Sequence, residues 1–184
     1  MHKTIFLIGY MGCGKTTLGT ALASLTSTPL IDLDEYIEQS CDATVKQIFE
    51  RDGEEGFRHI EQECLRKVSQ MKGVIVACGG GTPCFADNMD IMNDAGVTVW
   101  LTTSARRIAS RLALPEQKAK RPLIAQLNDK ELLEYVKAGM AAREPFYSRT
   151  QLRFDSTRLE SERDITNTAK RLAKVLEATE DLNS

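Results

Sequence analysis

The sequence predicts an α/β fold, with a parallel β-sheet covered by helices on both faces. Five apolar runs with the composition of short strands recur along the 184 residues, and stretches with helical periodicity lie between them. The runs are apolar throughout instead of alternating with polar residues, which is typical of strands buried on both faces. They cover residues 4–8, 29–32, 74–78, 97–101 and, with a weaker pattern, 151–155.

The first apolar run leads directly into the segment GYMGCGKTTLG, residues 9–19. The spacing Gly9-(x)4-Gly14-Lys15-Thr16 is the pattern of a phosphate-binding loop, in which backbone N–H groups converge on an anion. A helix beginning at Lys15 would add the positive end of its dipole. Lys15 could then reach the β- and γ-phosphates and Thr16 could ligate Mg²⁺, which predicts nucleoside triphosphate binding. The alternative is a glycine-rich turn that binds nothing.

Two carboxylates follow the second apolar run, in the segment PLIDLDEY. Asp32 closes the expected strand and is the better candidate for a Mg²⁺ ligand. Asp34 would point the same way in an extended chain, where it could orient an acceptor hydroxyl or accept its proton. The alternative for Asp34 is a cap on the helix that follows.

Two stretches interrupt the alternation of strand and helix. Residues 33–71 contain more helix than one crossover needs, and residues 113–127 form a polar excursion that contains proline. Ligands of open α/β folds bind at the carboxyl ends of strands, so insertions near that edge are candidates for substrate-holding and lid elements. We expect a single domain over 1–184, with a final helix over 163–179 covering the sheet.

Three arginines and a glycine run complete the candidate site. The segment GGGTP, residues 79–83, follows an apolar run and makes either a bare turn or a place where a ligand approaches the backbone. Arg58 and Arg143 lie beside or on apolar helix stripes, where a charge is costly unless it is paired. Each could instead extend its stem across the surface. Arg121 lies in the predicted lid and could reach a transferred phosphate.

Composition limits the partners and the compartment. The net charge of −2 gives no argument for binding nucleic acid, and no apolar run reaches the length of a membrane span. The five cysteines are odd in number and have no CxxC spacing, which favours reduced thiols. Because a strand begins almost at the first residue, we expect no signal peptide and a cytoplasmic protein.

Taken together, six segments in this order resemble the shikimate kinase family. They are GYMGCGKTTLG, DLDEYIEQ, IFERDGEEGFRHIE, GGGTP, KRPLI and REPFY, and they span nearly the whole chain. The resemblance implies a five-stranded parallel sheet of the nucleoside monophosphate kinase type of P-loop fold, with a substrate-binding insertion and a mobile lid. It also implies phosphoryl transfer from ATP to the 3-hydroxyl of shikimate, a step toward aromatic amino acids that yields shikimate 3-phosphate and ADP.

The resemblance further implies roles for individual residues. The expected contacts of the ATP phosphates are Gly12, Cys13, Gly14, Lys15, Thr16 and Thr17, with Arg121 reaching from the lid. Arg158 aligns more loosely with a position beside the nucleotide. The expected Mg²⁺ ligands are Thr16 and Asp32, and the expected shikimate-binding residues are Asp34, Arg58, Gly80 and Arg143. Lys15, Asp34 and Arg121 would be catalytic.

Other functions share parts of this pattern. A gluconate-type sugar-acid kinase would use the same loop and fold with another anionic polyol. A nucleotide-sensing switch would bind the nucleotide without transfer, although the chain has no NKxD-like segment. We expect ATP and shikimate as the small-molecule partners and a monomeric protein.

The thiol of Cys13 raises a separate hypothesis. Beside converging N–H groups and a helix N-terminus, it could be a reactive thiolate that bound ATP protects. The alternative is a small packed residue whose thiol is inert.

Overall fold

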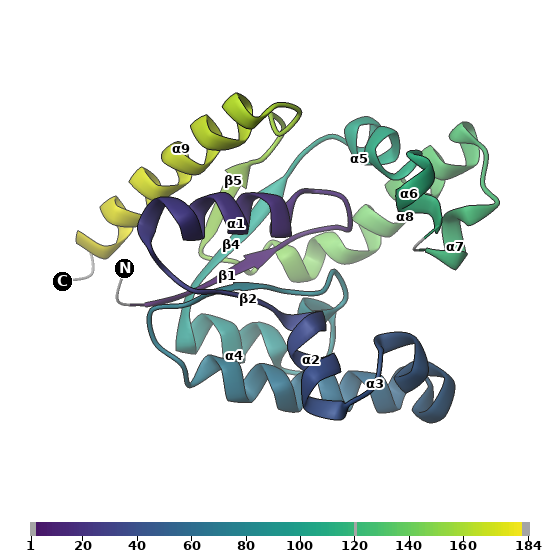
Figure 1. Ribbon diagram of the computed structural model, residues 1–184, viewed down its shortest axis with the longest axis horizontal. Helices are drawn as coiled ribbons and strands as arrows, with labels where there is room; N and C mark the ends of the chain where they lie inside the picture. The colour runs from purple at the N-terminus through teal and green to yellow at the C-terminus, as the bar shows by residue number, and fades with distance from the viewer. Residues whose placement is uncertain (1–2, 120, 182–184) are drawn as a thin grey trace.

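The computed structural model describes residues 3–119 and 121–181 (Figure 1). Its centre is a five-stranded sheet with the order β2-β3-β1-β4-β5, and every neighbouring pair is parallel. The strands are β1 (Thr4–Ile8), β2 (Leu30–Asp32), β3 (Ile75–Ala77), β4 (Gly96–Thr102) and β5 (Leu152–Asp155). All five predicted strands are therefore present, and the predicted fold class is confirmed.

The strand order explains where a ligand can bind. β1 lies in the middle of the sheet with all of its residues buried, β3 is on one side and β4 on the other. The chain therefore builds the β2–β3 side first and the β4–β5 side afterwards. The reversal leaves a crevice at the carboxyl end of β1, the usual ligand position in open α/β sheets.

Helices cover both faces of the sheet (Figure 1). On one face α1 (Lys15–Thr26) packs against α9 (Glu162–Asp181), the predicted final helix, in which Ala169, Leu172 and Leu176 are buried. On the other face α3 (Val45–Ser69) packs against α4 (Asn88–Ala95). Among the described residues, no helix has both the length and the apolarity needed to cross a bilayer.

The predicted substrate-binding insertion contains α2 (Leu33–Cys41) and the long helix α3. Gly53 breaks α3 with φ 71° and ψ −174°, a conformation that glycine adopts more readily than other residues. The helix α2 begins at Leu33, one residue after β2, because the Asp32 side chain caps it by accepting from the Asp34 N–H at 3.1 Å. The expectations that Asp34 is extended or caps a helix are therefore wrong, since Asp34 lies in the first turn.

The segment predicted as a lid folds into short helices at one end of the molecule (Figure 1). It follows α5 (Ala105–Leu112) and contains α6 (Pro115–Ala119) and α7 (Pro122–Ala125). The chain then enters α8 (Asp129–Tyr147), whose first turn is closed by a capping box between Asn128 and Glu131. The short helix η1 (Thr82–Cys84) completes the elements near the site.

Candidate active site

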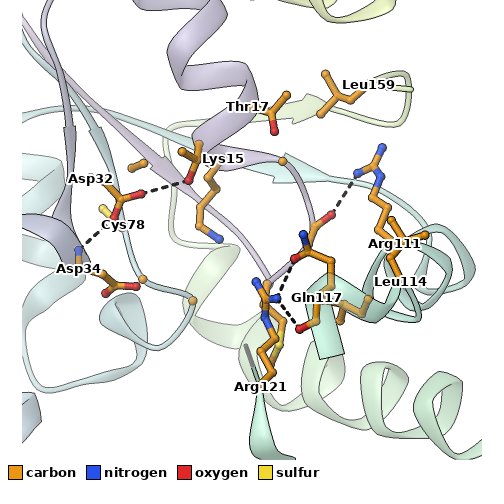
Figure 2. Close-up of a pocket in the computed structure, with 18 of the residues that line it drawn as sticks. Lys15, Thr17, Asp32, Asp34, Cys78, Arg111, Leu114, Gln117, Arg121 and Leu159 are labelled. Atoms are coloured by element: carbon orange, nitrogen blue, oxygen red, sulfur yellow. Dashed lines mark hydrogen bonds between the residues drawn. The ribbon is translucent and has the colours of Figure 1, made fainter. Parts of the chain in front are cut away.

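A large cavity of about 860 Å³ lies at the carboxyl ends of β1, β2 and β3 (Figure 2). Its volume is typical of small-molecule sites, which span roughly 300–1,000 Å³. The start of α1, the end of β2, the loop after β3 and the segment α5–α6 supply its walls. Of the predicted site residues, those that line it are Gly12, Gly14, Lys15, Thr16, Thr17, Asp32, Asp34, Gly80 and Arg121.

The phosphate-binding loop takes its shape from glycine. Gly14 has φ 101° and forms the N-cap of α1, which begins at Lys15 as predicted. With no side chain capping this helix, its first N–H groups are left for an anion. The Lys15 ammonium points into the cavity (Figure 2) and donates to the carbonyls of Gly9 at 2.8 Å and Tyr10 at 3.3 Å.

Oxygen atoms gather on the side of the cavity opposite Arg111 (Figure 2). The Thr16 hydroxyl donates to Asp32 at 3.1 Å. Asp34 faces the cavity, yet displacement of water by surrounding protein atoms and the charges of Asp32 and Glu61 raise its pKa to about 6, against an opposing effect of Lys15. The hydroxyl and carboxylate oxygens of Thr16 and Asp32 are the type of ligand that Mg²⁺ prefers.

The described residues hold no group of three or more His, Cys, Asp and Glu side chains that could bind a metal by themselves. A pair such as Thr16 and Asp32 instead suits a metal that completes its shell with phosphate oxygens and water, as Mg²⁺ commonly does.

Arg58 is fixed by a carboxylate that the sequence analysis did not identify. Its guanidinium donates to Glu61 at 2.7 Å, and Glu61 also accepts from the Thr82 hydroxyl at 2.5 Å. Glu61 is buried on the same face of α3 as Phe57, four residues earlier. The sequence does contain a signal for this contact, because Glu61 is an acidic residue on the apolar face of the helix. A carboxylate that is buried there requires hydrogen-bonding or charged partners.

The glycine run brings both predicted acceptor arginines to one place. A Cβ atom on Gly81 would lie 2.7 Å from the Arg58 guanidinium carbon, and one on Gly80 would lie 3.0 Å from Arg143. Arg143 also lies over the Tyr10 ring, 5.0 Å from its centroid. Gly80 therefore has one arginine beside it, and the phosphate-binding loop approaches it as well.

The carbonyl of Gly80 is held from α8. The Tyr147 hydroxyl donates to it at 2.6 Å, and burial raises the pKa of Tyr147 well above its ordinary value. This bond ties the end of α8 to the glycine run, a contact that sequence spacing did not indicate.

The lid side of the cavity carries two arginines with different partners. Arg121 donates to the Gln117 carbonyl at 3.0 Å and to its side-chain oxygen at 2.7 Å, and burial lowers the pKa of Arg121 (Figure 2). Arg111, which the sequence analysis did not select, donates to the carbonyls of Gly12 and Thr157, both at 3.1 Å. Arg158 is exposed and does not line the cavity.

Cys13 has a different setting from its neighbours in the loop. The residue is only 1% exposed and does not line the large cavity. Its carbonyl accepts from the Ser156 hydroxyl at 2.9 Å. Because a thiol reagent needs access to the sulfur, this burial argues against the reactive-thiolate hypothesis.

A phosphate-binding loop, a nearby carboxylate pair and cationic groups around one cavity define the class of P-loop kinases. The family model described as shikimate kinase matches residues 11–175. The chain belongs to the shikimate kinase family, and it is accordingly an ATP-dependent small-molecule kinase.

Individual relatives are similar over almost their full length. A shikimate kinase of Phocaeicola vulgatus is 45% identical over 94% of this chain and 97% of its own. The crystal structure of shikimate kinase from Bacteroides thetaiotaomicron has a TM-score of 0.91 and 40% identity, covering 96% of this chain and 99% of that one. A gluconokinase from Sinorhizobium meliloti, at 17% identity and a TM-score of 0.52, covers 96% of this chain and 97% of that one. That likeness is one of fold alone.

Proposed function

We propose that the protein transfers the γ-phosphoryl group of ATP to the 3-hydroxyl of shikimate, giving shikimate 3-phosphate and ADP. The observation that carries the proposal is one cavity lined by the phosphate-binding loop, Asp34 and Gly80, with Arg143 beside Gly80 and Arg58 beside the next residue, Gly81. Membership of the shikimate kinase family supports it.

The phosphate-binding loop would hold the ATP phosphates. Lys15 exchanges its contacts with the Gly9 and Tyr10 carbonyls for the β- and γ-phosphates, and the first N–H groups of α1 face the same oxygens. Arg121 would turn from Gln117 toward the transferred group when the segment 113–127 closes. Excluding water at that stage protects ATP from hydrolysis.

Thr16 and Asp32 would hold a divalent ion, which we propose is Mg²⁺. When bound, Mg²⁺ neutralises charge that develops on the β- and γ-phosphate oxygens. Their two oxygens already lie 3.1 Å apart, so both can approach one ion with little rearrangement.

Arg58, Arg143, Gly80 and Asp34 would hold the acceptor. Shikimate carries a ring carboxylate, which suits the planar guanidinium groups of the two arginines. The absence of a side chain at Gly80 lets the ring approach the backbone. The Asp34 carboxylate then accepts a hydrogen bond from the 3-hydroxyl and takes up its proton as the oxygen attacks phosphorus.

The test is an assay of ADP formation with shikimate, gluconate and AMP as alternative acceptors. We expect Mg²⁺-dependent turnover with shikimate, and a phosphorus NMR signal from a product phosphorylated at the 3-position. Preferred turnover of gluconate would replace this function with that of a sugar-acid kinase. ADP binding without turnover of any acceptor would indicate a nucleotide-sensing switch.

Two further proposals concern the state of the protein. We propose a monomer, to be checked by light scattering during size-exclusion chromatography. We also propose a cytoplasmic location, for which fractionation of the native cells is the measurement.

A further inference from the structure

A second cavity of about 290 Å³ lies behind the phosphate-binding loop. The end of β4, the start of α5 and the middle of α8 form its walls, together with Tyr10 and Cys13 of the loop. The second cavity and the large cavity have no lining residue in common. It is therefore a distinct cavity, although Tyr10 and Tyr147 in its wall also contact Arg143 and Gly80 of the proposed acceptor site.

The interior of the second cavity is aromatic. The rings of Trp100 and Tyr147 lie 5.8 Å apart at 55°, and Tyr10 and Met140 also line the space. Such walls favour a planar apolar group, because aromatic rings stack or meet edge to face. The volume is at the lower limit of small-molecule sites, roughly 300 Å³, which suits a molecule with a single ring.

The cavity wall also carries charges of both signs. Arg153 lies over Trp100, with its guanidinium carbon 4.7 Å from the ring centroid. Neither Arg153 nor Glu144 has an ion-pair partner within the described ranges, whereas Lys137 pairs with Glu134 at 2.8 Å. The exposed side chains of Arg153 and Glu144 thus offer one cationic and one anionic group to a ligand.

A buried hydroxyl adds an independent sign of a missing partner. Thr103 lines the second cavity, and its hydroxyl oxygen is buried without a hydrogen-bond partner among residues 3–119 and 121–181. Buried hydroxyl groups nearly always have such a partner, so a ligand or a water molecule is expected to supply it.

We propose that the second cavity binds a small aromatic zwitterion of the α-amino acid class, and that the bound molecule changes the affinity of the phosphate-binding loop for ATP. Its ring lies against Trp100 and Tyr147, its carboxylate faces Arg153 and its ammonium faces Glu144. Opposite charges at one opening select a zwitterion over a simple acid or amine, since either of these leaves one protein charge without a partner.

The effect on ATP follows from the residues that the occupant would touch. The Tyr10 carbonyl accepts hydrogen bonds from the Lys15 ammonium at 3.3 Å and from the Cys13 N–H at 3.1 Å. A ligand that shifts Tyr10 therefore alters the support of Lys15, the residue proposed to hold the ATP phosphates. Coupling between two sites typically changes affinity by about 5- to 150-fold, so a change of several-fold is expected.

Trp100 is the only tryptophan in the sequence, which makes its fluorescence a direct report on the second cavity. The full-length protein is titrated with L-phenylalanine, whose ring does not absorb at the red edge of tryptophan excitation. We expect a saturable change in Trp100 emission that persists when ADP and shikimate fill the large cavity. We also expect the KM for ATP to change several-fold at saturating L-phenylalanine.

Variants and analogues then test the proposed orientation. Glu144→Gln and Arg153→Gln should each weaken L-phenylalanine binding about two- to fivefold, the size expected for an ion pair that involves an exposed side chain. Phenethylamine has no carboxylate, so its weaker binding should be insensitive to Arg153→Gln but sensitive to Glu144→Gln. The matched controls Glu177→Gln and Arg163→Gln change exposed residues of α9 and should leave binding unchanged.

Three results would overturn the site: no saturable signal, a loss of L-phenylalanine affinity that keeps growing and does not level off as ADP and shikimate are raised, or equal affinity in Glu144→Gln, Arg153→Gln and the parent protein. Binding that follows the expected variant pattern but leaves the KM for ATP unchanged would overturn the proposed effect on the phosphate-binding loop. The fluorescence titrations need no turnover of an acceptor, so failure of the site is distinguishable from failure of the proposed function.

Discussion

The proposed nucleotide half and the proposed acceptor half of the site are built differently. The proposed phosphate contacts of the nucleotide half lie in one continuous segment, residues 9–17, which leaves β1 and enters α1, and side chains from α5, α6 and residues 159–160 line the same cavity. The proposed acceptor half has Asp34 of α2 and Gly80 in the cavity wall, and Arg58 of α3 and Arg143 of α8 lie beside Gly81 and Gly80, so it combines elements that are far apart in the sequence. The proposed phosphate contacts of the first half include backbone N–H groups at the start of α1, whereas the second half includes the long side chain of Arg58, which is held by Glu61.

This difference suggests how the two halves respond to change. A loop whose shape depends on glycine conformations keeps its backbone donors when a distant side chain is replaced. An acceptor site that depends on a chain of contacts such as Arg58–Glu61–Thr82 is altered wherever that chain is broken. We therefore expect acceptor-half variants to change catalysis or shikimate binding while leaving nucleotide binding close to normal.

The largest effect is expected for Asp34→Asn. The amide cannot take up a proton, so kcat should fall about 100-fold or more, the scale of general-base assistance. The affinity for ADP should remain close to that of the parent, because Asp34 lies in the acceptor half. Steady-state kinetics and calorimetric ADP titration measure both quantities. Glu35→Gln is the matched control, because Glu35 is the exposed neighbour of Asp34 in α2. This variant should leave kcat and the affinity for ADP nearly unchanged.

Arg58→Lys and Arg143→Lys should have the next largest effect. Lysine keeps the positive charge but loses the planar fork, so the KM for shikimate should rise about tenfold or more. The KM for ATP should change little. Arg66→Lys is the control, because Arg66 pairs with Asp87 on the surface. An equal rise of both KM values in the two acceptor variants would contradict the division between the halves.

Glu61→Gln tests whether the support of Arg58 matters as well as Arg58 itself. Loss of the charge beside this guanidinium should raise the KM for shikimate about three- to tenfold. Glu54→Gln is a close control, since Glu54 contacts the same arginine at 3.7 Å but is 76% exposed. Exposed ion pairs contribute little. If the two glutamine variants behaved alike, the buried chain of contacts would have no special role.

The smallest effect is expected at the predicted lid, where bound ligands should change how easily a protease reaches the backbone without changing the fold. ADP and shikimate together should slow limited proteolysis within residues 113–127, because closure protects the exposed backbone. Mass spectrometry of the fragments identifies the cleavage sites. Unchanged cleavage with both ligands present would contradict a mobile lid.

The fold could be predicted almost completely from the sequence, because five apolar runs buried on both faces leave few alternatives to a parallel sheet. The phosphate-binding loop could be predicted equally well, because its defining residues are neighbours in the sequence. The contacts of Glu61 and Tyr147 were not, because they join elements whose distance in space depends on packing. The prediction that Asp34 lies in an extended segment is wrong, because it relied on the two-residue spacing from Asp32 alone. The Asp32 side chain instead caps α2, which begins at the next residue.

The contact between Gly81 and Arg58 has a consequence for how acceptor use can be lost. A methyl group at position 81 would occupy the space of the guanidinium, with its carbon 2.7 Å from both the central carbon and Nη1 of Arg58. The three nearest atoms to this added carbon all belong to Arg58. With the proposed roles, Gly81→Ala would displace the Arg58 guanidinium from its present position, so one added carbon could weaken acceptor binding separately from nucleotide binding.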